Sequence, residues 1–299
     1  MEKRTVSLAL GAGGARGYAH IGVITWLNDH GFNIRSIAGS SMGALIGGLY
    51  AAGQLDNYTE WVRALQHRDV LQLLDLSFGS SGLFKGERVI QTLRDLTGDY
   101  NIEDLPLSFT AVTTDLDAEK EVWLSKGPLF DAIRASIATP TLFTPFHYKG
   151  RRLVDGGLVN PLPIAPTLRD MTDITIAVNL SGREEPDLEQ SGEHVVAGME
   201  NRYTRVIREF IEELLGKKPV EKETAELGMF DVISQSLDTM QNGIARLKLA
   251  SYSPDIIIDI PKNACYFHEF HRADHMIELG WQRAEKALTH QGVVSVGGI

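Results

Sequence analysis

The sequence predicts an α/β protein with three layers, in which helices cover both faces of a mostly parallel sheet. Short apolar runs of strand length alternate with stretches of helical periodicity along the first part of the chain. Glycines stand at the ends of several of these runs, where a chain of this class turns. Hydrophobic residues make up 43% of the 299 residues, which is enough for one large core.

The predicted elements follow in order from the N-terminus. The first strand is Thr5–Leu10, and a helix over Ile21–His30 follows it. The second strand, Ile34–Ala38, leads through a glycine-rich turn into a helix over Ala44–Ala52. Further strands are predicted at Phe109–Thr114, Val122–Leu124, Leu153–Asp155 and Ile174–Asn179.

Composition changes after Leu180, so we expect a core domain over residues 1–180 and a helical lobe over 181–250. The lobe carries two apolar stripes at helical spacing, for which we expect core packing or a helical hairpin. Residues 251–299 are predicted to return to the core as a buried strand, Asp255–Ile260, and a closing helix, His268–Leu288. The stripes contain Val195, Val196, Met199, Tyr203, Val206, Ile207, Phe210, Ile211 and Leu214, then Phe230, Ile233, Leu237, Met240, Ile244 and Leu247.

The charge and the cysteine content limit the class of partner. A formal net charge of -10 provides no field that attracts nucleic acid or anionic lipid, so membrane contact would depend on apolar loops. The one cysteine, Cys265, cannot form an internal disulfide, which fits a reducing compartment. No stretch approaches the roughly 18 apolar residues of a membrane span. We therefore expect a cytoplasmic protein, with peripheral contact at the inner membrane surface.

The motif Gly39-x-Ser41-x-Gly43 lies between a predicted strand and a predicted helix. Acyl transfer needs a hydroxyl that is held on a sharp turn and faces the substrate, and small flanking residues permit such a crowded backbone. The positive end of the following helix points toward the reacting centre. Ser41 is therefore the predicted nucleophile, and the alternative is an ordinary turn with a capping serine.

A second glycine-rich turn, Gly11-Ala12-Gly13-Gly14-Ala15-Arg16-Gly17, follows the first strand. Its main-chain N–H groups suit an anion, either a dinucleotide pyrophosphate or the oxyanion of an acyl-transfer intermediate. Arg16 stands where the dinucleotide motif requires Gly or Ala, and no acidic residue ends the second strand. We therefore favour an oxyanion hole, which adjacent parallel strands would bring beside Ser41.

The segment Leu153-Val154-Asp155-Gly156-Gly157 places an acid at the end of a strand, followed by two glycines. Alone it is compatible with a carboxylate that caps a turn. It becomes important because a serine at neutral pH needs a nearby base.

These three motifs, in this order, resemble those of the patatin-like phospholipase family. Ser81–Arg88 and Arg134–Pro140, together with Phe143 and Pro145, resemble further segments of bacterial members. The resemblance is continuous from about Val6 to Asn179, and the final strand and helix resemble the bacterial branch related to neuropathy target esterase. One departure is Ala12, where many members have a third glycine; alanine keeps its N–H, so we expect little loss.

The resemblance implies a patatin-like fold and a Ser–Asp dyad that needs no cofactor and no metal. Ser41 would attack the ester carbonyl, and Asp155 would accept its proton. The N–H groups of Gly13, Gly14 and Ala15 would hold the oxyanion, with Arg16 shaping the loop or meeting a lipid phosphate. Gly11, Gly17, Gly39, Gly43, Gly156 and Gly157 support the three motifs. The expected substrate is a lipid or another acyl ester.

The histidines leave two alternatives open. His268, His271 and His275 follow Asp155 in the chain order of an α/β-hydrolase triad, but that fold places its nucleophile later than the second strand. His271 and His275 are four residues apart, without the further ligand or motif of a zinc site. The second alternative is a non-catalytic regulatory or scaffold protein on the same fold. His20 and His147 lie near the motifs and are expected at the pocket.

The segment Thr139–Phe146, called the rim segment below, is apolar and contains two prolines. Its two interpretations are a loop that closes the core and an entrance for an acyl chain, with Leu83 and Phe84 nearby. The second predicts membrane contact through apolar side chains.

Overall fold

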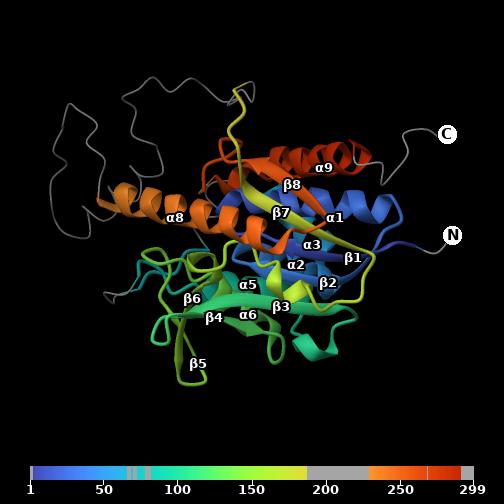
Figure 1. Ribbon diagram of the computed structural model, residues 1–299. Coiled ribbons are helices and arrows are strands. Elements are labelled where there is room, and N and C mark those ends of the chain that lie inside the picture. The colour runs from blue at the N-terminus through green and yellow to red at the C-terminus, as the bar shows by residue number, and fades with distance from the viewer. Residues whose placement is uncertain are drawn as a thin grey trace.

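One mixed sheet forms the centre of the protein (Figure 1). The computed structural model describes residues 3–65, 69, 73–77, 82–186, 229–267 and 269–290. In these residues eight strands form the sheet in the order β5-β6-β3-β2-β1-β7-β8, and β4 also pairs with β3. The strands are β1 (Thr5–Leu10), β2 (Asn33–Ser40), β3 (Ser108–Asp115), β4 (Lys120–Leu124), β5 (Phe146–Tyr148), β6 (Arg151–Asp155), β7 (Ile174–Gly182) and β8 (Ile256–Pro261).

The strand directions confirm the predicted fold class and add an antiparallel edge. The pairs β1–β2, β1–β7, β2–β3 and β7–β8 are parallel. The pairs β3–β4, β3–β6 and β5–β6 are antiparallel. The parallel pairing of β1 with β2 brings Leu10 beside Gly39, so the turns that follow these two strands lie at the same edge of the sheet.

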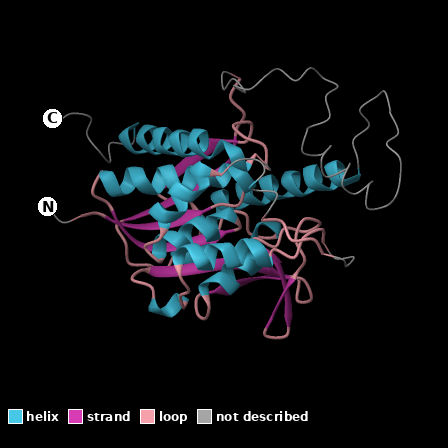
Figure 2. Cartoon of the chain, turned by 180° about the vertical axis from the view of Figure 1, so that it is seen from behind, coloured by secondary structure: helices cyan, strands magenta, loops and turns pink. Residues whose placement is uncertain are grey.

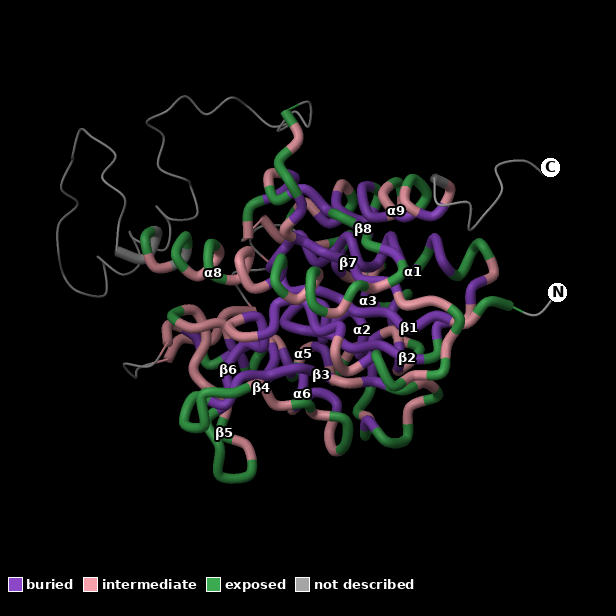
Figure 3. The backbone as a smooth tube through the Cα atoms, viewed as in Figure 1, coloured by how far each residue is buried: buried purple, intermediate pink, exposed green. Residues whose placement is uncertain are grey.

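Helices cover one face of the sheet with a large hydrophobic core (Figure 2). Side chains of β1 such as Leu8 and Leu10 point into this core and are fully buried. The buried backbone appears in Figure 3 as a continuous central region. The helices of the described residues are α1 (Ala19–Asp29), α2 (Met42–Ala51), α3 (Leu55–Ala64), α5 (Glu87–Thr97), α6 (Leu129–Ser136), α8 (Met229–Tyr252) and α9 (Ala273–His290), with short 3-10 turns between some of them.

The opposite face has a much smaller cover in the described residues. Ala9 of β1 and Ala177 of β7 pack there with Leu162, Ile164 and Ala245 of α8. Alternation along β1 explains the difference, because neighbouring residues of a strand point to opposite faces. Small alanines on this side allow α8 to lie close to the sheet.

The last described strand and helix return to the sheet. β8 pairs with β7, and α9 packs along α1. The α1–α9 contact is close: a Cβ on Gly22 would lie 1.9 Å from the carbonyl oxygen of Ile277, so only glycine fits. β8 is not fully buried as predicted, because it is the end strand and Ile257 is exposed.

Of the predicted helical lobe, the structure describes residues 181–186, which include the end of β7, and the helix α8. The first apolar stripe, from Val195 to Leu214, lies outside the described residues. In the second stripe, Met240 is 52% exposed and Leu247 is 68% exposed, so these two side chains do not pack into the core. The alternative of a hairpin between the two stripes stays a prediction. The core contact comes instead from a neighbouring face of the helix, through Ala245. No described helix is long and apolar enough to span a membrane.

Candidate active site

Ser41 lies in a sharp turn between β2 and α2, as the motif predicts. Its backbone has φ 54° and ψ −121°, a conformation that costs a residue with a side chain about 1–3 kcal/mol. Gly39 and Gly43 allow the turn to close. A Cβ on Gly43 would lie 2.1 Å from the carbonyl oxygen of Leu10, so any larger residue would push α2 away from β1.

The hydroxyl of Ser41 donates a hydrogen bond to the carboxylate of Asp155. The distance from Oγ to Oδ2 is 2.7 Å, although 114 positions separate the two residues in the chain. The N–H of Gly157 donates to Oδ1 at 2.7 Å, and the hydroxyl of Thr139 donates to Oδ2 at 2.8 Å. Gly156 and Gly157 begin the 3-10 turn after β6, which lets the chain bend back to the carboxylate.

Burial makes Asp155 a better proton acceptor than an exposed aspartate. Ser41 is 4% exposed and Asp155 is 3% exposed. Burial raises the pKa of Asp155, and the hydrogen bonds from Ser41, Gly157 and Thr139 lower it by a smaller amount. The net rise brings the carboxyl closer to the basicity that a general base needs.

The glycine-rich loop after β1 offers two free N–H groups beside the elbow. The N–H of Ala12 donates to Pro161, and that of Gly11 donates to Val178. The N–H of Ala15 donates to the carbonyl of Phe267 at 2.9 Å. The N–H of Ala15, which was expected to serve the oxyanion, thus already has a protein acceptor in this structure. Within the described chain, the N–H groups of Gly13 and Gly14 have no protein acceptor.

Arg16 shapes this loop from within. Its side chain is 8% exposed, and it donates from Nε to the carbonyl of Gly13 and from Nη1 to the carbonyl of Lys262. Burial lowers the pKa of Arg16, and the nearby carboxylate of Asp238 on α8 raises it. Gly17 allows the loop to touch the elbow, since a Cβ there would lie 2.4 Å from that of Met42. The geometry favours the loop-shaping role over contact with a lipid phosphate.

No histidine of the described residues hydrogen bonds to Ser41 or Asp155. His20 is fully buried and lies 2.8 Å from the carbonyl of Gly11, so it supports the loop rather than lining a pocket. His147 is exposed on β5. His271 lies in the 3-10 turn Phe270–Arg272, and His275 lies in α9. His268 lies outside the described residues. Among the residues that the structure describes, no three potential ligands cluster as a metal site would require.

The rim segment packs against Leu83 and Phe84, as expected. The N–H of Phe84 donates to Leu142, and the N–H of Thr144 donates to Phe84. Phe143 is half-buried, 6.5 Å from the ring of Phe84 and 5.9 Å from the guanidinium carbon of Arg134. Its ring therefore has a packing role of its own, whatever else the segment does.

Sequence reasoning missed two polar side chains at the site, Ser136 and Thr139. Both belong to a segment that the motifs had marked only by resemblance. Ser136 is fully buried and accepts a hydrogen bond from the N–H of Ser41 at 2.9 Å. The only available signal was the presence of hydroxyl residues within an otherwise apolar stretch.

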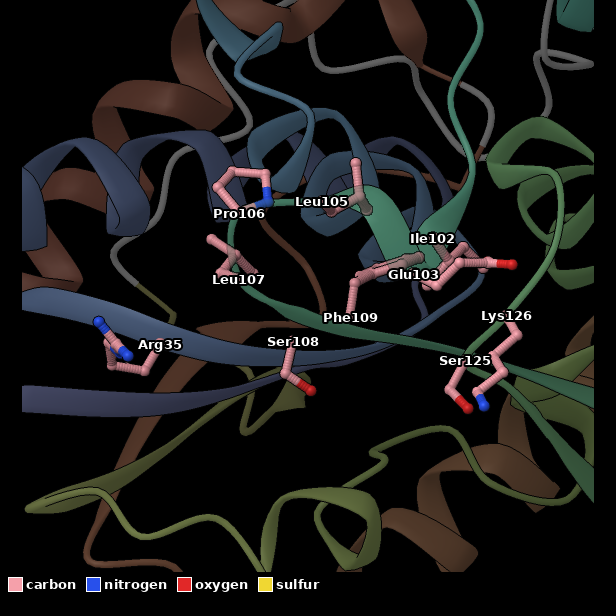
Figure 4. A pocket seen from close by; sticks show the side chains of 10 residues that line it. All are labelled: Arg35, Ile102, Glu103, Leu105, Pro106, Leu107, Ser108, Phe109, Ser125 and Lys126. Atoms are coloured by element: carbon pink, nitrogen blue, oxygen red, sulfur yellow. The ribbon is translucent and has the colours of Figure 1, made fainter.

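A shallow pocket lies at the other end of the sheet (Figure 4). Its volume is about 450 Å³, and Arg35, Glu103 and Lys126 are among the residues that line it. Arg35 is near the start of β2, whereas Ser41 follows the end of that strand. This pocket is open and lacks a nucleophile paired with a base, so the elbow is the better candidate.

Comparison with known proteins identifies the family. The model of the patatin-like phospholipase family matches residues 8–168, a span that contains the glycine-rich loop, the elbow and Asp155. This chain belongs to the patatin-like phospholipase family. Membership implies lipid acyl hydrolase activity and agrees with the observed sheet and its covering helices.

Relatives connect this member of the patatin-like phospholipase family to the neuropathy target esterase group. An uncharacterized NTE family protein of Mycobacterium tuberculosis is 39% identical over 327 residues, which cover 95% of this chain and 91% of the relative. Patatin-like phospholipase domain-containing protein 6 of Homo sapiens is 34% identical over 198 residues, which cover 63% of this chain and 14% of the relative. Neuropathy target esterase sws of Drosophila melanogaster is 32% identical over a similar share, 63% and 14%.

Proposed function

We propose that this chain is a serine acyl-ester hydrolase that cleaves phospholipids or lysophospholipids and releases free fatty acid, with Ser41 as nucleophile and Asp155 as base. The observation that carries the proposal is the 2.7 Å hydrogen bond between Ser41 and Asp155 at a strained elbow. Membership of the patatin-like phospholipase family supports the substrate class.

The chemistry takes place in two acyl transfers. Oγ of Ser41 attacks the ester carbonyl while its proton moves to Oδ2 of Asp155, and the carbonyl oxygen becomes an oxyanion. The bond to the alcohol then breaks, and the alcohol takes the proton from Asp155. Water next attacks the acyl-enzyme and gives its proton to Asp155, which returns it to Ser41 as the fatty acid leaves.

The free N–H groups of Gly13 and Gly14 are the proposed oxyanion donors. Main-chain donors fixed by the fold need no reorganisation when the charge develops, and one such donor typically contributes about 10²–10³-fold in rate. The N-terminus of α2 adds positive potential at the same place. In this proposal, the hydrogen bond from Arg16 to the carbonyl of Gly13 keeps that carbonyl turned away from the oxyanion.

We propose cytoplasmic residence and peripheral contact with the inner membrane surface through apolar side chains. The net charge of -10 makes electrostatic attraction to anionic lipid unfavourable. The half-exposed rim segment is the candidate contact.

The test compares two adjacent serines. Ser41→Ala should lower the hydrolysis of a phospholipid and lysophospholipid panel by on the order of 10⁴-fold or more. Ser40→Ala is the matched control, because its buried hydroxyl has no hydrogen-bond partner in the described residues. A fluorophosphonate probe should label the wild type and Ser40→Ala at Ser41, and should not label Ser41→Ala. Undiminished ester hydrolysis by Ser41→Ala would falsify the assignment and favour a non-catalytic role for the site.

A further inference from the structure

One short segment contacts both members of the proposed dyad. It runs from Ser136, the last residue of α6, to Thr139. The hydroxyl of Ser136 accepts the N–H of Ser41 at 2.9 Å and donates to the carbonyl of Val112 at 2.6 Å. The hydroxyl of Ser136 thus donates its proton to β3 and accepts the main-chain N–H of Ser41. These two hydrogen bonds fix the hydroxyl in one orientation.

The other end of the segment contacts the base. The carbonyl of Ala138 accepts the main-chain N–H of Asp155 at 3.0 Å. The hydroxyl of Thr139 donates to Oδ2 of Asp155 at 2.8 Å. Oδ2 is the same oxygen that accepts the hydroxyl of Ser41, so two donors converge on one carboxylate oxygen.

The segment is itself anchored by Arg134, whose side chain is 2% exposed. Its guanidinium donates to the main-chain carbonyls of Lys85 and Thr144. It lies 3.6 Å from the carboxylate of Glu87 and 5.6 Å from the ring centre of Phe146. Arg134 therefore ties the end of α6, just before Ser136 and Thr139, to the chain at Lys85 and Thr144.

We propose that Ser136 and Thr139 are positioning residues of the dyad, Ser136 by fixing the main chain of the nucleophile and Thr139 by orienting the carboxylate and sharing its proton-accepting oxygen. This inference rests on the proposed function. It gives the 136–139 segment a role in the reaction that is separate from any contact with the acyl chain.

The role of Thr139 has a consequence that packing alone does not. A hydroxyl that donates to a carboxylate favours the ionised form, so it opposes the effect of burial on Asp155. The groups that act on Asp155 in the described residues are the donors Ser41, Thr139 and Gly157, and no charged side chain contributes. Removal of the Thr139 hydroxyl should therefore let Asp155 take up a proton at higher pH.

The first experiment compares Thr139→Val with Thr139→Ser by recording kcat/KM from pH 4 to pH 9. In Thr139→Val the acid limb should move to higher pH by about one unit, since one hydrogen bond to a charged group is removed. Its plateau should also fall, because the carboxylate is less well oriented. Thr139→Ser keeps the hydroxyl and should restore both the limb and the plateau. Equal losses in the two variants, or a Thr139→Val profile that superimposes on the wild type, would overturn the role of Thr139.

The second experiment concerns the nucleophile. Ser136→Ala leaves the buried N–H of Ser41 without an acceptor, so kcat should fall roughly 10- to 100-fold. KM should stay within about twofold, since the substrate is not contacted. The rate of fluorophosphonate labelling at Ser41 should fall by the same factor. Ser125→Ala, an exposed serine in another loop, is the control and should behave as the wild type.

These outcomes separate the inference from the proposed function. If Ser41→Ala abolishes hydrolysis while Ser136→Ala labels at the wild-type rate, the dyad stands and the positioning role of Ser136 is wrong. If Ser41→Ala retains full hydrolysis, the proposed function itself has failed. Thermal melting of each variant shows whether it is folded. If Ser136→Ala does not fold, the comparison of Thr139→Val with Thr139→Ser still tests whether the segment positions the dyad, because Thr139 is only half-buried.

Discussion

His20, in the first turn of α1, directs its Nε2 at the main-chain carbonyl of Gly11, 2.8 Å away. A carbonyl only accepts, so Nε2 carries the proton and the buried Nδ1 has no partner in the described residues. Burial lowers the pKa of His20 to about 4. The loop that supplies the proposed oxyanion donors thus rests on a histidine that must remain neutral.

The stability of the protein should consequently fall in mild acid. An unfolded histidine takes up a proton below about pH 6.5, whereas folded His20 resists until about pH 4. Acid therefore favours the unfolded chain, and the contribution to the free energy of unfolding that is lost between these values is about 3 kcal/mol. Urea unfolding at pH 7 and at pH 4.5 measures it.

The matched comparison for this prediction is His20→Gln against His147→Gln. His147→Gln makes the same replacement at an exposed histidine of β5, while His20→Gln should flatten the pH dependence. The raised pKa of Asp155 acts in the opposite direction but is common to all three proteins. An unchanged slope in His20→Gln would show that His20 does not control acid stability.

Asp155→Asn should abolish turnover, because an amide cannot accept the proton of Ser41. Alanine at His268, His271 or His275 should leave most of the activity. The measurement is kcat/KM with a lysophospholipid. A single histidine whose loss matches the Ser41→Ala defect would replace the dyad with a triad.

Arg16→Lys should lower kcat about tenfold or more, with little change in KM. The guanidinium bonds two carbonyls in different directions, those of Gly13 and Lys262, and an ammonium group cannot reproduce this geometry. The carbonyl of Gly13 would then be free to turn toward the oxyanion. Arg35→Lys, at an exposed arginine, is the control. Wild-type kcat in Arg16→Lys would show that the loop holds its shape without the guanidinium.

Activity should rise with acyl-chain length. Each methylene that leaves water contributes about 0.8 kcal/mol, so medium and long acyl esters should show higher kcat/KM than acetyl esters. Phe143→Asp is a poor test of this idea, because Phe143 packs against Arg134 and Phe84 and its loss would also reduce stability. A chain-length series on the wild type is cleaner. A preference for acetyl esters would indicate a small-ester hydrolase.

The sequence predicted those features that local rules determine. The elbow at Ser41 could be found because its sharp turn requires glycines at fixed positions, and the strand that ends at Asp155 has a clear pattern. The contact between the N–H of Ala15 and the carbonyl of Phe267 could not be predicted, because Phe267 is far along the chain. The stripe on α8 showed an amphipathic helix, but periodicity does not say which face the rest of the fold will cover. Thr139 was missed because its partner is set by tertiary packing.

The glycine-rich loop is made early in synthesis, but two of its supports are made late. Lys262 accepts from Arg16, and Phe267 accepts from Ala15, and both lie close to β8 and α9. When Ser41 and Asp155 have emerged from the ribosome, the nascent chain therefore still lacks the contacts that shape the loop. Because a domain generally folds as a unit, we expect hydrolytic competence only when the segment that contains Lys262 and Phe267 has docked. A chain that stops before Lys262 would contain Ser41 and Asp155 but lack two of the contacts that shape the loop beside them.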